Sequence, residues 1–412
     1  MSEQQVDVLI IGAGPAGASA ACLLQQAGLE TLIIEKEQFP RFVIGESLLP
    51  HCMDLLDEAG LLEAVKKRNY IIKYGAEFFR GNEHFTFDFS KQFTEGWKHT
   101  FEVPRDDFDH TLAQATEAKG IPILWQHTVT AVNFSEDGSS KTTIINDSGD
   151  SIQIKARFIL DGSGYGRVLP RLLNLDAPSH LPNRTALFTH IEGDIRPEGA
   201  REGNIWINMM NDEENAWMWI IPFSNGTTSV GVVARSEFLD QFPSEPNEQL
   251  KSIIDSTPAP RKRLTEAKFL FPARQIEGYS ISVKQLSGPG YALMGNATEF
   301  LDPVFSSGVT LALESANRAA KTVIRQLNGK EPNWDIEYAE HLMLGVDTFR
   351  AFVNAWYDSR LPTLIFSKNK PANIENQICS VLAGYVWDKN NPCIDQPDRV
   401  LDLLYNHCIA ST

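Results

Sequence analysis

Apolar residues near the amino end of the chain form short runs separated by a stretch of helical spacing. Val6–Ile11 is a continuous apolar run that ends in a glycine turn, which is typical of a buried strand. Ala16–Ala27 has apolar residues at helical spacing, and Thr31–Glu35 is again a short apolar run. Because a strand, a helix and a second strand in this order tend to pair in parallel, the chain is predicted to begin with a βαβ unit.

The same patterns predict the elements that follow. In chain order they are a helical segment at Leu48–Lys67, strands at Ile71–Phe79, Phe85–Phe89 and His99–Val103, a helix at Asp106–Lys119, and strands at Ile123–Phe134, Thr142–Ile145 and Ile152–Leu160. Residues 183–274 are predicted to be mostly strands and turns, with a hairpin at Asn225-Gly226 between Trp217–Phe223 and Thr228–Ala234. A short strand at Tyr291–Met294, a long helix from about Ser307 to Leu327 and a largely helical remainder complete the prediction.

A glycine-rich turn joins the first strand to the first helix. Its sequence, Gly12-Ala13-Gly14-Pro15-Ala16-Gly17, has GxGxxG spacing at Gly12, Gly14 and Gly17, with Ala16 before the last glycine. Glycines let the backbone approach a pyrophosphate, and the helix N-terminus supplies amide donors and positive potential. Glu35 ends the next strand about 20 residues later, where a ribose-binding acid is expected. These features predict a dinucleotide site, and they leave NAD and FAD as alternatives.

The order of the patterns predicts the domain organisation. The fold class is α/β, with a Rossmann-like nucleotide-binding domain interleaved with a strand-rich substrate domain, plus a helical C-terminal region. The predicted nucleotide-binding pieces are residues 1–75, 105–175 and 275–330. The substrate domain comprises residues 76–104 and 176–274, and the helical region comprises residues 331–412.

Composition excludes several classes of partner. The formal net charge of −16 argues against nucleic acid and against an anionic membrane. No apolar run is long enough to span a bilayer, and the N-terminus lacks the basic region of a signal peptide. The five cysteines are scattered and lack CxxC spacing, which argues against a disulfide framework and a zinc site. We therefore expect a cytoplasmic protein.

Four later segments bear on the choice between NAD and FAD. Asp161-Gly162 follows a predicted strand, Gly295-Asn296 follows another, Arg105 precedes Asp106-Asp107-Phe108-Asp109, and Phe39-Pro40-Arg41 precedes Gly45-Glu46-Ser47. Together they resemble the FAD motifs of flavin-dependent aromatic hydroxylases and halogenases. The resemblance implies that FAD is bound by Arg41, Glu46, Ser47, Arg105, Asp161, Gly295 and Asn296. Asn296 stands where these enzymes usually carry Asp, and its lack of charge predicts weaker FAD binding.

Two tryptophans alternate in Trp217-Met218-Trp219-Ile220-Ile221-Pro222. Alternation of this kind is typical of ordinary core packing on a strand. The segment also resembles the Trp-x-Trp-x-Ile-Pro signature of flavin-dependent halogenases, with Pro222 at its last position. The resemblance implies that Trp217 and Trp219 line a tunnel and fill space that would otherwise admit substrate to the flavin.

The segment from Phe300 to Gly308 precedes the long predicted helix. Phe300, Pro303, Ser306 and Gly308 fit the halogenase pattern Phe-x-x-Pro-x-x-Ser-x-Gly. A helix N-terminus presents free amides and favours an anion, and Ser306 or Ser307 can cap the helix. The resemblance implies that the amides of Ser307 and Gly308, beside Ser306, hold chloride or bromide. The alternative is a serine-capped helix that touches the flavin, as in the hydroxylases.

Lys73 is the one lysine in the apolar segment Tyr70–Phe78. Such a lysine usually lies at an edge or extends its ammonium to solvent. Lys73 also matches the halogenase lysine between flavin and substrate. The resemblance implies that reduced FAD, O2 and halide yield hypohalous acid, which Lys73 directs onto the ring. As an ammonium, Lys73 would polarise the acid; as a free amine, it would form a haloamine, and burial would lower its pKa and assist this second route.

The resemblance also bears on partners and substrate. No second dinucleotide fingerprint is found, which implies that reduced flavin comes from a separate NAD(P)H-dependent flavin reductase. Phe305 stands where tryptophan halogenases carry a glutamate, and the chain lacks their long C-terminal region. Both departures favour a phenol or a pyrrole, free or tethered to a carrier protein, over free tryptophan.

Three alternatives to a halogenase share the predicted fold. The nearest is an FAD-dependent aromatic hydroxylase in which the tryptophan strand is core packing. A prenyl-lipid reductase of the geranylgeranyl reductase type would need an apolar substrate tunnel. A non-catalytic FAD-binding redox module would need neither the loop at Phe300–Gly308 nor Lys73.

Overall fold

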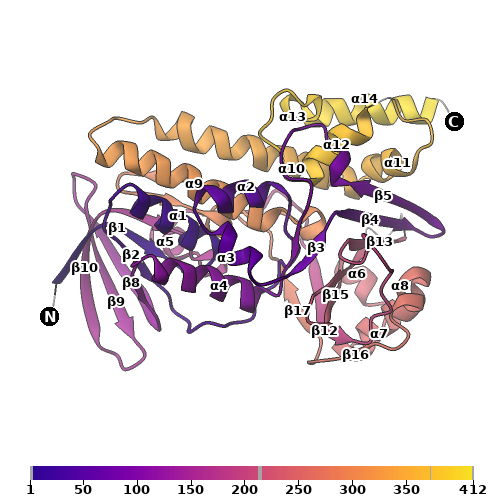
Figure 1. The fold of residues 1–412 in the computed structure, drawn as a ribbon, viewed down its shortest axis with the longest axis horizontal. Helices are drawn as coiled ribbons and strands as arrows, with labels where there is room; N and C mark the ends of the chain where they lie inside the picture. Colours follow the sequence, from indigo (N-terminus) through magenta and orange to yellow (C-terminus); the bar gives the residue numbers. More distant parts are fainter. Residues whose placement is uncertain (1–2, 212–215, 372, 411–412) are drawn as a thin grey trace.

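Two eight-stranded sheets and a group of C-terminal helices make up the computed structural model, which describes residues 3–211, 216–371 and 373–410 (Figure 1). The α/β class and the helical C-terminal region are confirmed. The boundaries at which the two domains alternate stay a prediction.

The first sheet contains the predicted βαβ unit. Its strand order is β19-β20-β10-β1-β2-β7, and β9 joins β10 to β8. Its strands are β1 (Glu3–Ile11), β2 (Thr31–Ile34), β7 (Ile123–Leu124), β8 (His127–Phe134), β9 (Ser140–Asn146), β10 (Ser151–Asp161), β19 (Ser287–Gly288) and β20 (Tyr291–Leu293).

Strands β20, β10, β1 and β2 pair with one another in parallel. The register pairs Ile11 with Ile34 and Asp161, and Asp161 with Leu293. The segments that follow all four strands therefore meet at one edge of the sheet, which is where ligands of such sheets bind.

Six helices accompany the first sheet: α1 (Pro15–Gln26), α2 (His51–Glu58), α3 (Leu62–Lys66), α4 (Arg105–Ala118), α5 (Val168–Leu172) and α9 (Ser307–Leu327). The long helix predicted from about Ser307 to Leu327 is confirmed as α9. The single helical segment predicted at Leu48–Lys67 is wrong, because the chain turns at Gly60 (φ +67°) between α2 and α3. A positive φ after a helix is a usual stop, and glycine adopts it without strain.

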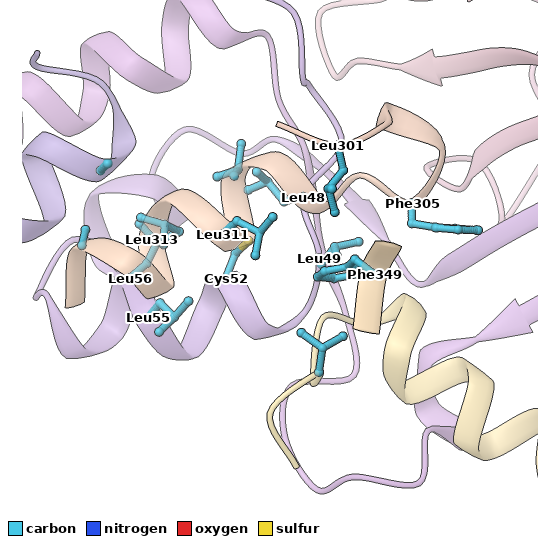
Figure 2. Packing of buried hydrophobic residues seen from close by; sticks show 14 of the residues in the cluster. Leu48, Leu49, Cys52, Leu55, Leu56, Leu301, Phe305, Leu311, Leu313 and Phe349 are labelled. Atoms are coloured by element: carbon cyan, nitrogen blue, oxygen red, sulfur yellow. The ribbon is translucent and has the colours of Figure 1, made fainter. Parts of the chain in front are cut away.

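Helix α2 packs on α9 through an apolar interface. Figure 2 shows Cys52, Leu55 and Leu56 of α2 facing Leu311 and Leu313 of α9. All five side chains are buried in one hydrophobic cluster, so the start of α9 is held against α2.

The second sheet carries the tryptophan strand. Its order is β16-β12-β15-β14-β13-β4-β5, with β17 also paired to β12. Its strands are β4 (Gly75–Arg80), β5 (Glu83–Asp88), β12 (Thr185–Glu192), β13 (Ile205–Asn211), β14 (Ala216–Pro222), β15 (Thr228–Ala234), β16 (Lys268–Phe269) and β17 (Arg274–Glu277). The hairpin at Asn225-Gly226 is confirmed by the antiparallel pairing of β14 with β15.

The prediction that residues 183–274 are mostly strands and turns is wrong for part of this range. Three helices, α6 (Ser236–Leu239), α7 (Pro246–Ser256) and α8 (Pro258–Arg263), pack on the outer face of the second sheet. A proline opens both α7 and α8, where its fixed φ suits a first helical position.

Side chains of β14 divide between the two faces of the sheet. Trp217, Trp219 and Ile221 belong to the central core, whereas Met218 and Ile220 pack in the cluster with the outer helices. This alternation follows from the period of two along a strand.

The structure also has two small two-stranded sheets: β3 (Ile71–Lys73) pairs with β6 (Thr100–Glu102), and β11 (Asp176–Ala177) pairs with β18 (Ser282–Val283). The strand predicted at Ile71–Phe79 is thus two strands, β3 and β4, which belong to different sheets. This break places Lys73 outside the second sheet.

The C-terminal region consists of a π-helical turn, η5 (Asp335–Glu340), and the helices α10 (His341–Tyr357), α11 (Arg360–Phe366), α12 (Ile374–Leu382), α13 (Pro392–Asp395) and α14 (Pro397–Ala410). These helices run along the top of the view in Figure 1, over α2 and near β5. Within the described ranges, no helix is both long and apolar enough to cross a membrane.

A buried histidine–carboxylate cluster ties α2, α9 and α10 together. Glu314 of α9 accepts hydrogen bonds from Nε2 of His51 at 3.3 Å and Nε2 of His341 at 2.6 Å. Burial lowers the pKa of His51, but Asp54 and Glu314 together raise it to about 9. Burial raises the pKa of Glu314, but the two histidines hold it below its usual range.

We predict that this cluster makes stability fall at alkaline pH. The pKa of His51 is about 9 in the folded chain and about 6.5 in the unfolded chain, so its contribution is complete below pH 6.5 and is lost as pH rises through about 9. Between about pH 6 and pH 10, the free energy of unfolding should drop by ~3 kcal/mol more in the wild type than in His51→Gln. Urea unfolding measures this difference. His110→Gln, on α4, is the control, and equal pH dependence in wild type and His51→Gln would contradict the prediction.

Candidate functional site

One cavity lies between the edge of the first sheet and the inner face of the second. Sixteen of the predicted site residues line it: Gly12, Gly14, Ala16, Glu35, Arg41, Glu46, Ser47, Arg105, Trp217, Trp219, Gly295, Asn296, Phe300, Pro303, Ser306 and Gly308. Five predicted residues do not line it: Gly17, Lys73, Asp161, Pro222 and Ser307. The fold therefore brings most of the sequence motifs to a single site.

The glycine turn makes backbone contacts that exclude side chains. A Cβ on Gly17 would lie 1.9 Å from the carbonyl oxygen of Gly12, and a Cβ on Gly12 would lie 2.5 Å from that of Gly162. Gly14 differs, because its nearest neighbour to a Cβ would be the Arg41 guanidinium at 3.6 Å. Gly17 and Gly12 thus serve packing, while Gly14 presents bare backbone to the cavity. This arrangement fits the pyrophosphate of FAD.

Glu35 is fixed at the end of β2 by two backbone amides. Its carboxylate accepts hydrogen bonds from Ala13 N at 2.8 Å and Glu37 N at 2.9 Å. Each carboxylate oxygen has a further lone pair, so Glu35 can also accept a hydrogen bond from a ribose hydroxyl.

Asp161 shapes a loop and does not line the cavity. It accepts hydrogen bonds from Ser163 N at 2.9 Å and Leu169 N at 2.7 Å. Burial raises the pKa of Asp161, and these amides oppose the rise. The carboxylate therefore holds the turn η2 (Gly164–Gly166) in place at the cavity.

Arg167 was missed by the sequence reasoning. It adopts a left-handed conformation (φ 46°) and its guanidinium donates to the backbone oxygens of Asn296 at 3.2 Å and Ser282 at 2.9 Å. It thereby fixes Asn296, at the centre of η3 (Gly295–Ala297), against the cavity. An arginine outside any motif gives no sequence signal for such a contact.

Two arginines share the buried carboxylate of Asp109. Arg105 donates to it twice, at 2.8 and 3.0 Å, and Arg41 donates to it once, at 3.0 Å. Arg105 also donates to the carbonyls of Ile44 and Gly45. These bonds use four of the five N–H donors of Arg105, so much of its binding capacity positions the 41–47 loop.

Glu46 has an unexpected partner from the second sheet. Its carboxylate lies 2.6 Å from Nε2 of His190 on β12. Glu46 is buried and lines the cavity, so this pair ties the loop along the flavin site to the second sheet. The two residues are 144 positions apart, and no spacing in the sequence links them.

The two tryptophans are buried and held by hydrogen bonds. Trp219 Nε1 donates to Ser229 Oγ at 3.0 Å, and its ring occupies space above Gly231, where a Cβ would lie 2.2 Å from the ring. Trp217 Nε1 donates to Tyr357 Oη at 2.9 Å, and that hydroxyl donates to Asp302 at 2.9 Å. Tyr357 on α10 therefore connects the tryptophan strand to the 300–308 loop.

The 300–308 loop ends at the N-terminus of α9. Ser306 is the N-cap residue with φ +55°, and its side chain makes no capping hydrogen bond. The expected serine cap is therefore wrong for Ser306, because the left-handed backbone turns its side chain from the first helical amides. Ser306 and Gly308 line the cavity, so the N-terminus of the 21-residue helix α9 borders it. Such a terminus attracts an anion.

Lys73 is fully enclosed, contrary to the usual behaviour of a strand lysine. Its Nζ donates to Ser47 Oγ at 2.7 Å and to Leu48 O at 2.9 Å. Burial lowers the pKa of Lys73. Since Ser47 lines the cavity, Lys73 lies directly behind it.

Phe305 contacts the C-terminal helices. Its ring lies 6.4 Å from that of Phe352 and 6.1 Å from that of Trp356, both on α10. It is buried and does not line the cavity.

Comparison with known proteins gives consistent results. A family model described as FAD binding domain matches residues 5–342. A 1H-pyrrole-2-carbonyl-(peptidyl-carrier protein) chlorinase from Pseudomonas fluorescens is 28% identical over 413 residues, covering 94% of this chain and 91% of that enzyme. A tryptophan 2-halogenase from Chondromyces crocatus is 31% identical over 323 residues, and the match covers 77% of this chain and 60% of that enzyme.

A solved structure resembles the chain along its whole length. It is a flavoprotein/dehydrogenase from Cytophaga hutchinsonii with 47% sequence identity and a TM-score of 0.96, covering 99% of this chain and 100% of that one. The fold around the cavity is therefore that of an FAD-binding enzyme.

We predict that Gly14→Ala weakens FAD binding without destabilising the protein. The added methyl has room within the chain, at 3.6 Å from Arg41, but it lies where the pyrophosphate must approach. FAD affinity should fall at least ~10-fold, measured by flavin fluorescence, while the melting temperature of FAD-free protein changes by about 2 °C or less. Gly17→Ala is the matched contrast, since its methyl meets a carbonyl at 1.9 Å and should lower the melting temperature too. Unchanged FAD affinity in Gly14→Ala would place the cofactor elsewhere.

Proposed function

Since this chain belongs to the flavin-dependent halogenases, we propose that it uses reduced FAD, O2 and chloride or bromide to halogenate an electron-rich aromatic ring. One observation carries this proposal. A single cavity is lined by the glycine turn at Gly12 and Gly14, by Trp217 and Trp219, and by the start of α9 at Ser306 and Gly308.

The cofactor supplies redox chemistry, and the chain binds the cofactor and keeps the substrate away from the flavin. Bound reduced FAD provides, with O2, the oxidising equivalents that convert halide to hypohalous acid. Gly12, Gly14 and Glu35 would hold the nucleotide end, and the loop with Arg41, Glu46 and Ser47 would lie along the flavin. Asn296 is proposed to form a hydrogen bond with FAD, as acceptor or donor, without adding charge to the site.

The 300–308 loop is proposed as the halide site. The backbone amides of Ser307 and Gly308 and the positive end of the α9 dipole would bind the anion. Gly308 has no side chain to fill the site, and a Cβ there would meet the Phe300 ring at 3.4 Å. Phe300 and Pro303 would then close the apolar side of this loop.

Trp217 and Trp219 are proposed to separate the flavin from the substrate. Both rings are buried and anchored by hydrogen bonds, so they cannot move aside without losing a partner. Pro222 ends their strand, and its missing N–H limits pairing beyond that point. A ring held behind the tryptophans would receive hypohalous acid but would not reach the flavin.

Lys73 is proposed to direct the halogen onto the ring. It lies behind Ser47, so hypohalous acid that leaves the cavity past Ser47 would meet the lysine Nζ. Hydrogen bonding to the oxygen of the acid makes the halogen more electrophilic, and the ring proton and the hydroxyl group leave as water.

We propose a phenol or a pyrrole as substrate, free or tethered to a carrier protein. The first of the compared relatives is named for a carrier-bound pyrrole, which supports the tethered form. Phe305 packs on Phe352 and Trp356 and brings no carboxylate to the site, which argues against the tryptophan class. A separate NAD(P)H-dependent flavin reductase is proposed as the partner that reduces FAD.

An FAD-dependent aromatic hydroxylase is the second candidate. Ala186, Ile205 and Ile276 line the cavity on the inner face of the second sheet, where an aromatic ring could lie beside the flavin. The position of Lys73 outside the cavity lining favours the hydroxylase.

The first test supplies the enzyme with a flavin reductase, NADH, FAD, O2 and bromide, and offers it phenols and pyrroles in free and carrier-loaded forms. We expect brominated product that depends on bromide, detected by mass spectrometry. Hydroxylated product formed without halide would refute the halogenase and establish the hydroxylase.

We predict that Lys73→Met abolishes ring halogenation, by at least ~10³-fold, and leaves FAD affinity unchanged. Methionine fills a similar volume in this buried position without a donor. A diffusible cyclic diketone that traps hypohalous acid should still be halogenated. Retained ring halogenation would remove Lys73 from its proposed role.

We further predict that crystals grown with bromide give anomalous signal beside the amides of Ser307 and Gly308. Bromide found elsewhere in the cavity, with none at this loop, would contradict the halide assignment.

A further inference from the structure

Glu102 is a buried carboxylate without a hydrogen-bond partner. It lies on β6 with no exposed surface, and neither carboxylate oxygen makes a hydrogen bond to the described residues. A buried carboxyl group in this state is costly, and such groups commonly serve a function.

The pairing of β3 with β6 places Glu102 beside Lys73. Ile71 is opposite Glu102 and Lys73 is opposite Thr100, so all four side chains share one face of this two-stranded sheet. Ser47 bridges to Glu102 through its backbone and accepts a hydrogen bond from Lys73 through its hydroxyl. Glu102, Lys73 and Ser47 therefore form one group, in which Ser47 faces the cavity.

The contacts of Lys73 Nζ are those of a proton donor. Its partners are the Ser47 hydroxyl oxygen at 2.7 Å, the Leu48 carbonyl oxygen at 2.9 Å and the face of the Phe89 ring at 5.7 Å. A carbonyl oxygen and a ring face can only receive a proton donor or a cation, and the hydroxyl oxygen also accepts from Nζ. A neutral amine would have to accept its hydrogen bond from the Ser47 hydroxyl, while its own N–H groups kept the Leu48 and Phe89 contacts.

The charges around this group act in two directions. Burial lowers the pKa of Lys73, whereas Glu102 and Cys52 oppose that change. Burial raises the pKa of Glu102 to about 8, Lys73 and Ser47 oppose this rise, and Glu46 adds to it. Glu46 is itself paired with His190.

We propose that Glu102 is a positioning residue that keeps Lys73 in its ammonium form, with Nζ held between Ser47 and Leu48. When Glu102 loses its proton, its carboxylate lies on the same face of the small sheet as Lys73. The carboxylate that forms then retains the lysine proton in surroundings that water does not reach. This inference rests on the proposed function, because it assigns the form in which Lys73 meets hypohalous acid.

The proposal selects one of the two chemical routes open to Lys73. The ammonium donates a hydrogen bond to the oxygen of hypohalous acid, the halogen bonds to a ring carbon, and the ring proton and the hydroxyl group leave as water. Lys73 ends the step with the same protons that it had at the start. A haloamine is not formed, since that route would first require loss of a lysine proton.

The test follows Lys73 in wild type and in Glu102→Gln. Lysines labelled with ¹³C at the ε carbon report the protonation of each amine by NMR, and the Lys73→Met variant identifies the Lys73 signal. We expect Glu102→Gln to lower the pH midpoint of Lys73 by at least about one unit, because no carboxylate forms to hold its proton. The high-pH limit of ring halogenation should move to lower pH by a similar amount, relative to trapping of hypohalous acid by the cyclic diketone.

Glu77→Gln is the matched control. Glu77 is an equally buried carboxylate on β4, but it is bonded to His84, Thr86 and Asn204. Its substitution should leave the Lys73 midpoint unchanged. Glu102→Asp, which keeps the carboxylate, should stay closer to the wild type than Glu102→Gln.

Each outcome decides between the proposals. The role of Glu102 would be overturned if Glu102→Gln left the Lys73 midpoint unchanged. It would also be overturned if the substitution moved the low-pH limit of ring halogenation and not the high-pH limit. If Glu102→Gln does not fold, the wild type alone suffices, since loss of the Lys73 proton before that of Glu102 would overturn the proposal. If the Lys73 midpoint shifts as expected but the diketone traps no hypohalous acid, the halogenase function is refuted. The pairing of Glu102 with Lys73 then still stands.

Discussion

The packing of α9 on α1 is the constraint on which the site depends. Ser19 of α1 donates to Asn317 of α9 at 2.6 Å, and Gly295 N donates to Ser315 of α9 at 2.9 Å. Buried side chains of both helices belong to one hydrophobic cluster. A packed interface of this kind does not slide easily, because interiors are close-packed. The N-terminus of α9 is therefore fixed relative to the glycine turn that begins α1, and both are directed at the same cavity.

Buried carboxylates organise the remainder of the site, and each has a different partner. Asp109 is bound by two arginines, Glu46 by a histidine from the second sheet, and Asp302 by two tyrosine hydroxyls, those of Tyr279 and Tyr357. Burying an ionised group is unfavourable unless hydrogen bonds or opposite charges compensate. Such pairs specify how the loops join the two sheets, since a shifted loop would leave a charge without its partner. Glu102 is the exception, because neither of its carboxylate oxygens has a hydrogen-bond partner among the described residues.

The sequence predicted the local features well where they depend on short spacing. The βαβ start, the hairpin at Asn225-Gly226 and the helix at Ser307–Leu327 all follow from patterns within about 30 residues. The errors arose where a short element is decided by its surroundings. Helices α6 to α8 are brief and exist against the outer face of the second sheet, and the strand predicted at Ile71–Phe79 divides because its halves pair with different strands. Secondary-structure propensities along the chain reflect neither the packing on the sheet nor the choice of pairing strand.

The sequence by itself determined the chemistry that the chain can offer: glycines for a nucleotide, two tryptophans on a strand, a helix start for an anion, and a lysine in apolar surroundings. These depend on residue type and short-range spacing, which the chain carries in any conformation. The tertiary structure alone decided that Lys73 lies behind Ser47, that Glu46 meets His190, and that Tyr357 joins Trp217 to Asp302. Each of these contacts links distant parts of the chain. Their formation depends on how sheets and helices pack, because burial of a polar group selects whichever partner the fold brings within hydrogen-bonding distance.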